Sequence, residues 1–228
     1  MISVVIPTLN AEKHLASCLS FLMPAAIDGL VKEVIIVDGG SGDQTRKIAE
    51  ESGARFVEAP CGRGTQLAEG ARLARGEWLL FLHADTRLEP SWLDEARALI
   101  SNVERVGVFT LKFDTQDLGA KIVSTVAMLR TKIFALPYGD QGLLISRTLY
   151  EELGGYHHSL LFEDVDFIDR LKKKNGRRTL HIFKSAAITS PEHYERHGYI
   201  RRVVDNFWRL IRYKAGVPPE KLAKGYWS

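Results

Sequence analysis

The chain has few cysteines, no long apolar run and little net charge. Cys18 and Cys61 are too few for a disulfide framework and fit no metal-site spacing, which indicates a reducing compartment. No apolar stretch approaches the roughly eighteen residues that a membrane span needs. The first residues also lack the basic and apolar regions of a leader. We therefore expect a cytoplasmic protein without a membrane span.

A formal net charge of +3 over 228 residues is too small to indicate nucleic-acid binding. The sequence shows no internal repeat, no low-complexity tract and no obvious interdomain linker. A chain of this length can build one sizeable hydrophobic core. We predict a single domain over residues 1–228 that binds no nucleic acid.

Strand-like and helix-like segments alternate through the first half of the chain. The predicted strands are Ile2–Ile6, Glu33–Val37, Arg55–Glu58, Trp78–Leu82 and Val106–Phe113. The predicted helices lie near Glu12–Leu22, Gln44–Ser52, Thr65–Ala74 and Ser91–Ile100, and Asn10 is the expected N-cap of the first. Strands separated by such helices form right-handed crossovers and a mostly parallel sheet. The fold class is therefore predicted to be α/β.

The second half is less regular. It contains a predicted helix at Ala120–Leu129, a turn-rich segment at Pro137–Gly142, a short strand at Leu143–Ile145, a helix from near Asp164 and a basic amphipathic helix at Tyr199–Ala215.

The apolar run that starts at Trp78 stops abruptly at the polar residues His83 and Asp85. Ligands of open α/β sheets bind outside the carboxyl ends of the strands. A carboxylate at that place is suited to hold a divalent cation against a substrate phosphate. The alternative is that Asp85 only caps the following helix.

Polar loops also follow the first two predicted strands, as Pro7-Thr-Leu-Asn10 and Val37-Asp-Gly-Gly-Ser-Gly-Asp43. Asp38 could accept hydrogen bonds from a nucleobase or a ribose, or the loop could be a plain turn in which Asp43 caps the next helix. Neither a dinucleotide fingerprint nor a P-loop follows the first strand.

Three further places carry candidate side chains. Arg63 lies between two glycines at a helix start, which suits a phosphate, although it could be a solvated loop residue. Glu163 and Asp164 begin a helix after an apolar segment. One of them could act as a general base, or both could simply interact favourably with the helix dipole. Asp140 and Gln141 lie between glycines and could reach an acceptor or sugar hydroxyl, or form a β-turn.

Four segments together resemble the family 2 glycosyltransferases of GT-A fold, in order and spacing. They are Val4–Asn10, Val37–Asp43, Leu82–Thr86 and Phe162–Asp164. Arg63–Gln66, Leu136–Gly142 and Tyr213–Tyr226 resemble a bacterial subgroup described as transferases associated with radical-SAM or selenium-domain proteins. The resemblance implies a GT-A, Rossmann-like sheet flanked by helices, with a nucleotide-binding half (1–113), an acceptor half (114–190) and a C-terminal helical extension (191–228).

The resemblance also implies a nucleotide-diphospho-sugar donor, Mn²⁺ or Mg²⁺, and inversion at the anomeric carbon. The nucleotide pocket would include Thr8, Asn10, Glu12, Asp38 and Arg63. Asp85 would meet the metal, Asp164 would act as the base, and Glu163 would support it. The acceptor is not identified by the resemblance.

His83 stands where the family usually has the first aspartate of a D-x-D motif. An imidazole can bind Mn²⁺ but brings no negative charge, and hard Mg²⁺ prefers oxygen. With Asp85 and His83 as the metal residues, we expect a site that binds metal weakly without donor, or that holds it mainly through Asp85 and the diphosphate. His193 and His197 could supply a late ligand or lie on the surface. The Q-x-x-R-W motif of processive synthases is absent, which favours transfer of a single sugar.

Two other functions remain open. A nucleotidyltransferase would be expected to carry a glycine-rich, arginine-containing turn after the first strand, and the chain does not. A nucleotide-sugar-binding protein with little activity would be consistent with His83.

The basic helix has an apolar stripe formed by Ile200, Val203, Val204, Phe207 and Ile211. We expect Val203 and Phe207 to face the core, which predicts packing on the domain. The alternatives are a dimer contact or docking on a membrane surface.

Overall fold

The computed structural model describes residues 1–101, 105–159, 161–192, 195 and 198–223. Eight strands form one sheet in the order β3-β2-β1-β4-β7-β6-β8-β5. The strands are β1 (Ile2–Thr8), β2 (Val31–Asp38), β3 (Arg55–Glu58), β4 (Trp78–Phe81), β5 (Thr86–Leu88), β6 (Val106–Phe113), β7 (Leu143–Ser146) and β8 (Leu180–Thr189).

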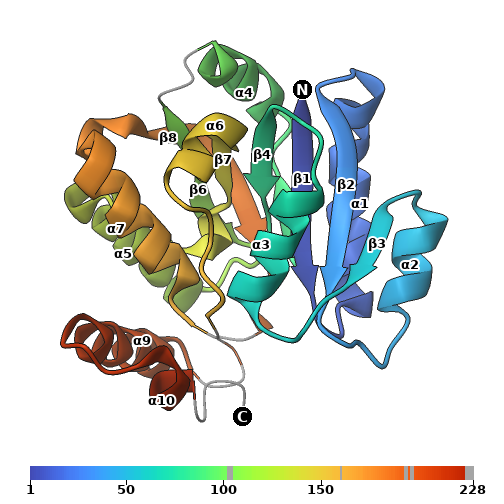
Figure 1. Ribbon diagram of the computed structural model, residues 1–228. Helices are drawn as coiled ribbons and strands as arrows, with labels where there is room; N and C mark the ends of the chain where they lie inside the picture. The colour runs from blue at the N-terminus through green and yellow to red at the C-terminus, as the bar shows by residue number, and fades with distance from the viewer. Residues whose placement is uncertain (102–104, 160, 193–194, 196–197, 224–228) are drawn as a thin grey trace.

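Helices cover both faces of this sheet (Figure 1). They are α1 (Glu12–Ile27), α2 (Thr45–Glu51), α3 (Arg63–Leu73), α4 (Trp92–Ile100), α5 (Leu118–Phe134), α6 (Arg147–Glu152), α7 (Glu163–Asn175), α9 (Tyr199–Lys214) and α10 (Pro219–Ala223), with 3₁₀ turns η1 (Gly139–Gln141) and η2 (Arg177–Thr179). The predicted α/β class with a helical C-terminal part is confirmed.

The first four strands make one parallel part of the sheet, and β6 and β8 also pair in parallel. β1 pairs in parallel with both β2 and β4, and β2 pairs in parallel with β3. The register places Thr8 beside Asp38, so the loops after β1 and β2 leave the sheet together. β7 then joins β4 antiparallel and continues the sheet into the second half of the chain.

The sequence prediction missed β5, α6, β8 and α10. Strand β8 contains a lysine and small residues and lacks the clean alternation of a half-buried strand. It forms because its ladder with β6 runs from Val106 to Phe113, with a register shift near Val108. The strand conformation of this segment therefore depends more on its pairing with β6 than on its local sequence.

Two local predictions were wrong. Asn10 does not cap α1: the cap position is Ala11, and Asn10 itself has a φ of 51°. Phe207 does not face the core, because its side chain is 57% exposed. Val203 does pack as expected, against the buried group that includes Leu111 and Val123.

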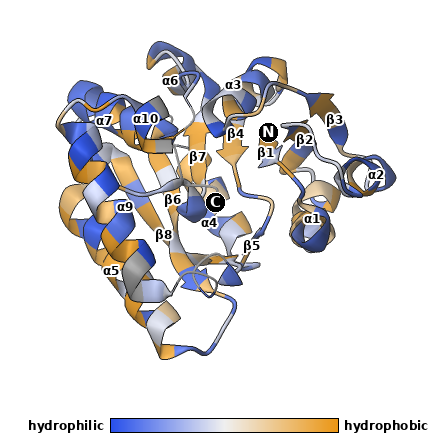
Figure 2. Ribbon diagram, turned by 90° about the horizontal axis from the view of Figure 1, so that it is seen from below, coloured by the Kyte–Doolittle hydropathy of each residue, from blue (hydrophilic) through white to orange (hydrophobic). Residues whose placement is uncertain are grey.

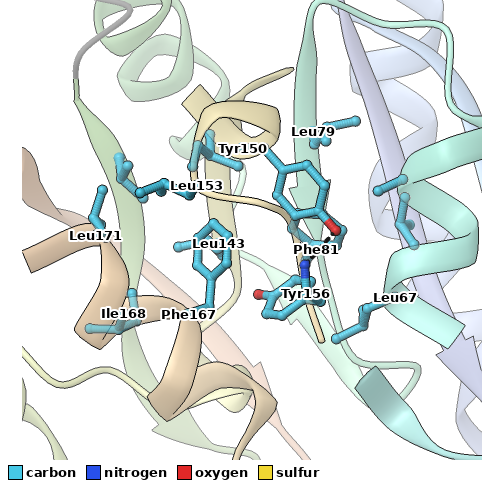
Figure 3. Packing of buried hydrophobic residues seen from close by; sticks show 14 of the residues in the cluster. Leu67, Leu79, Phe81, Leu143, Tyr150, Leu153, Tyr156, Phe167, Ile168 and Leu171 are labelled. Carbon is cyan, nitrogen blue, oxygen red and sulfur yellow. Dashed lines mark hydrogen bonds between the residues drawn. The ribbon is translucent and has the colours of Figure 1, made fainter. Parts of the chain in front are cut away.

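An aromatic cluster packs between the start of α7 and the end of β4 (Figure 3). The ring of Tyr156 lies 4.9 Å from those of both Phe81 and Phe167. The backbone N–H of Tyr156 donates to the hydroxyl of Tyr150 at 2.9 Å. Because Phe81 ends β4 and Phe167 belongs to the second turn of α7, this packing holds the start of α7 beside the end of β4.

Candidate active site

The carboxylate of Asp38 organises the loop after β2. Its Oδ2 accepts the N–H groups of Gly40 and Ser41 at 2.9 and 2.7 Å, and its Oδ1 accepts the hydroxyl of Thr8 at 2.8 Å. The side chain is only 2% exposed. Asp38 therefore shapes the glycine-rich loop, and its contact with a base or ribose stays a prediction.

Asn10 and Glu12 join the loop after β1 to the loop after β2. The amide Oδ1 of Asn10 accepts the N–H of Gly42 at 2.9 Å, and Oε2 of Glu12 accepts the N–H of Gln44 at 3.0 Å. The N–H of Glu12 in turn donates to Asp43 at 3.0 Å. These bonds fix two exposed loops relative to one another at the carboxyl edge of the sheet.

A hollow opens beside these loops at the ends of β2 and β3. Its lining residues are Asp38, Gly39, Gly40, Ser41, Arg46, Phe56, Glu58, Ala59, Pro60 and Cys61. The guanidinium of Arg46 lies 5.3 Å from the centre of the Phe56 ring. A flat aromatic side chain and nearby backbone N–H groups are suited to a nucleobase and its ribose.

Gln66 is a positioning residue to which the sequence analysis gave no role. Its Nε2 donates to the carbonyls of Thr8 and Val37, each at 2.8 Å, and the side chain is 4% exposed. These two carbonyls lie at the carboxyl ends of β1 and β2. Gln66 thus links the carboxyl ends of β1 and β2, where the Thr8 carbonyl also accepts the Gly39 N–H at 2.9 Å.

Arg63 and Glu163 connect the start of α3 to the start of α7. The Arg63 Nε donates to Glu163, which is 1% exposed. Burial raises the pKa of the Glu163 carboxyl, and the Arg63 charge opposes that rise. A Cβ on Gly64 would lie 2.4 Å from the backbone oxygen of His157, so glycine permits the close approach of these segments.

Asp164 and His83 converge on Gly139. The N–H of Gly139 donates to Oδ2 of Asp164 at 2.8 Å. A Cβ on Gly139 would lie 2.8 Å from Nε2 of His83 and 3.7 Å from the same Asp164 oxygen. The predicted base and the predicted metal-side imidazole therefore lie within 4 Å of one point, although they are about eighty residues apart in the chain.

Arg130 also belongs to this group, and the sequence analysis missed it. Its guanidinium carbon lies 3.4 Å from the centre of the Tyr138 ring, and its Nε donates to the Leu136 carbonyl. Burial raises the pKa of Asp140 to about 6; the charge of Arg130 lowers it and that of Asp164 raises it. Among the described residues, neither Oδ1 of Asp140 nor Nη2 of Arg130 has a hydrogen-bond partner, and both atoms are buried.

Gln141 does not occupy the place that the sequence suggested. Its side chain is 0% exposed, its Oε1 accepts the hydroxyl of Thr131 at 2.8 Å, and its Nε2 donates to the Phe109 carbonyl at 3.0 Å. These two hydrogen bonds hold η1 against α5 and β6. The proposed contact of Gln141 with an acceptor is therefore withdrawn.

Asp85 and His83 are the two candidate metal ligands on the loop after β4. The Asp85 side chain is half-buried and accepts one long hydrogen bond, from the Thr86 hydroxyl at 3.3 Å. Across the described part of the chain, no three His, Cys, Asp or Glu side chains form a metal-binding group. His193 and His197 lie outside the described residues. Two protein donors completed by diphosphate oxygens fit Mn²⁺ or Mg²⁺, which commonly keep ligands from substrate and water.

The sequence places the chain in a known family. The model of glycosyl transferase family 2 matches residues 3–140. This match covers more than half of the chain, so the chain belongs to glycosyl transferase family 2.

Curated relatives match over shorter segments. Glucosyl-3-phosphoglycerate synthase of Mycobacterium tuberculosis (strain ATCC 25618 / H37Rv) is 38% identical over 93 residues, which are 37% of this chain and 28% of that protein. A PGL/p-HBAD biosynthesis glycosyltransferase of Mycobacterium bovis is 36% identical over 112 residues, which are 46% of this chain and 43% of that protein. The match spans less than half the length of each relative.

Solved structures share the architecture. The M. tuberculosis glucosyl-3-phosphoglycerate synthase crystallised with Mn²⁺, UDP-glucose and phosphoglyceric acid has a TM-score of 0.61 at 23% identity, over 91% of this chain and 78% of that one. Mannosyl-3-phosphoglycerate synthase from Rubrobacter xylanophilus has a TM-score of 0.61 at 17% identity, over 83% and 67%. These values confirm the predicted GT-A fold.

The raised pKa of Asp140 predicts how stability depends on pH. Its folded pKa of about 6 exceeds the ordinary value of 3.8, so the folded protein loses stability as the pH rises from about 4 to about 6. Asp140→Asn removes that charge and should stabilise the protein at pH 8 relative to pH 4, by at most about 3 kcal/mol. Urea unfolding at both pH values measures this difference.

Asp94→Asn is the matched control, since the Asp94 side chain is 89% exposed. Between pH 4 and pH 8, the free energy of unfolding of Asp94→Asn should change as that of wild type does. That of Asp140→Asn should lack the loss that the Asp140 carboxylate causes in wild type. Equal pH dependence in both variants would contradict the buried-charge account of Asp140.

Proposed function

We propose that the chain transfers a single sugar from a nucleotide-diphospho-sugar to an acceptor hydroxyl, with inversion and with the help of Mn²⁺ or Mg²⁺. The observation that carries this proposal is the meeting of Asp164 with His83 at Gly139. A carboxylate able to accept a proton thus lies next to the segment that can hold a metal and a diphosphate.

The donor would lie along the carboxyl edge of the sheet. Its base would occupy the hollow beside Asp38 and Phe56, where the loop is already fixed by hydrogen bonds. Its diphosphate would reach the loop after β4, where Asp85 and His83 would hold the metal. When bound, the metal supplies positive charge that stabilises the departing diphosphate. Arg63 would add positive charge at the start of α3.

Asp164 would act as the general base. The acceptor oxygen forms a bond to the anomeric carbon while the bond from that carbon to the diphosphate breaks, and the electron pair leaves with the diphosphate. The acceptor proton passes to a carboxylate oxygen of Asp164. The Gly139 N–H holds Oδ2 of this carboxylate in place at 2.8 Å. Attack from the face opposite the leaving group produces inversion.

Asp140 and Arg130 would bind a hydroxyl of the acceptor or the sugar. The buried Oδ1 of Asp140 can accept a hydrogen bond, and the buried Nη2 of Arg130 can donate one. A hydroxyl group offers both a donor and an acceptor, so it would satisfy two groups that the described chain leaves unpaired.

UDP-glucose is the first donor to test, because a solved structure of similar fold was crystallised with it. The acceptor of that relative is not carried over, since the matched segment covers only 28% of the curated protein. Membership of the radical-SAM-associated subgroup stays a prediction.

A nucleotide-sugar-binding protein with little activity is the second candidate, and His83 is the observation that favours it. A nucleotidyltransferase is disfavoured by the family match and by the loop after β1, which carries Asn10 and no arginine.

We expect metal-dependent nucleotide binding to require Asp85. The stabilisation of the protein by UDP with Mn²⁺, over that by UDP alone, should disappear in Asp85→Asn, because a ligand stabilises the folded protein by RT ln(1 + [L]/Kd) and adds nothing when it no longer binds. Asp94→Asn should keep the full effect. An unchanged Mn²⁺ effect in Asp85→Asn would assign the metal to other residues.

We expect Asp164 to act in the chemical step. Asp164→Asn should lower turnover by about 10²–10⁴-fold while UDP-sugar affinity stays close to that of wild type. Asparagine keeps only one oxygen to accept the N–H groups of Gly139 and Val165, which bond to the two oxygens of Asp164, so circular dichroism checks that the variant is folded. A loss of donor affinity as large as the loss of turnover would make Asp164 a structural residue and Glu163 the next candidate.

A further inference from the structure

Large apolar side chains are exposed along α5 and α9. On α5 they are Leu118, Ile122, Val126, Leu129 and Ile133, which are between 47% and 75% exposed. Their spacing places them on one stripe of the helix, opposite the buried Ala120, Val123 and Ala127. On α9 they are Val204, Phe207, Trp208 and Ile211, between 40% and 59% exposed.

The two helices that carry these stripes pack against one another. Tyr199 and Val203 of α9 pack on the buried group that includes Ala120 and Val123 of α5. A Cβ on Gly119 would lie 2.8 Å from the Tyr199 ring. Figure 2 shows both helices along one side of the molecule, each with apolar segments. We call the exposed apolar residues of these helices the α5–α9 face.

Positive charge is concentrated on the same two helices. α5 contains three lysines and arginines and no acidic residue, and α9 contains five with one aspartate. The pair therefore carries a net charge of +7, whereas the whole chain carries +3, although Arg130 of α5 lies in the candidate site and not on this surface. Lys172 and Arg177 lie at the end of α5, where they donate to the carbonyls of Phe134 and Ile133. Asp169 forms ion pairs with both Lys172 and Lys214 and offsets part of this charge.

We propose that the α5–α9 face binds an anionic membrane surface. Apolar residues beside a basic polar face are the pattern of helices that lie in the membrane interface, and each Lys or Arg there strengthens attachment to anionic lipid. A dimer of two such faces would bring like charges together, which disfavours a second copy as the occupant. No described helix is long and apolar enough to cross a membrane. Of the two residues on which the prediction against docking rested, Phe207 is exposed, whereas Val203 packs as expected.

The face lies close to the proposed base. The ring of Tyr213 on α9 stacks on Phe162 with centroids 4.7 Å apart, and Phe162 directly precedes Glu163 and Asp164. Lys214 also forms an ion pair with Asp169 of α7. A membrane-bound α9 would therefore hold the start of α7 near the lipid surface, where a lipid-linked acceptor could reach Asp164.

Vesicle flotation of the full chain without donor tests this inference independently of sugar transfer. The chain should float with phosphatidylcholine vesicles that contain phosphatidylglycerol, less so at high salt, and hardly at all with phosphatidylcholine alone. Phe207→Ser with Trp208→Ser should weaken binding by about tenfold or more, since each side chain loses apolar burial.

Ile122→Ser with Val126→Ser tests the α5 side of the face in the same way. Ile27→Ser is the matched control, because Ile27 is 82% exposed on α1 and should leave binding unchanged. Circular dichroism confirms that each variant is folded. The proposal is overturned if anionic vesicles are not bound, or if the α5 and α9 variants bind as wild type does. It is also overturned if light scattering shows a dimer that the Phe207 and Trp208 variant converts to monomer.

Discussion

The contact between Arg63 and Glu163 joins the two parts of the chain from which the proposed site is built. Arg63 starts α3 on the nucleotide side, and Glu163 starts α7 beside the proposed base. Glu163 is almost fully buried, so its charge is tolerated only because a cation lies against it. The close approach at Gly64 and the aromatic cluster between α7 and β4 have the same effect, because both bring the start of α7 toward the sheet. Together with the Gly139 N–H, these contacts hold Asp164 beside the loop after β4.

Much of the fold was accessible from the sequence because its signals are local. The first, second and fourth strands contain apolar runs that end in polar loops, and that pattern predicted both the parallel sheet and the edge at which ligands would bind. β8 escaped prediction because its pairing partner, β6, lies about seventy residues earlier in the chain. Asn10 was mistaken for a helix cap because the sequence could not show that its amide reaches across to Gly42.

The site was predictable in its types of residue and less so in its detail. Asp85 could be chosen because it follows a buried strand, whereas the metal-side role of His83 and the choice of Asp164 over Glu163 came from the resemblance to the family. The sequence could not show which side of η1 faces the site: the structure leaves Oδ1 of Asp140 without a hydrogen-bond partner among the described residues and turns Gln141 inward, toward Thr131. Arg130 lies in the middle of α5 and carries no local signal, so only tertiary structure could reveal it.

The central claim is that this edge of the sheet catalyses inverting sugar transfer. The most direct test incubates the chain with Mn²⁺ and a panel of α-linked UDP-sugars and GDP-sugars, and follows the anomeric configuration of the transferred or released sugar by proton NMR. The account predicts metal-dependent cleavage of at least one donor, with the β-configured product appearing first. A first product of α configuration, or no cleavage of any donor by folded protein that binds it, would contradict the account.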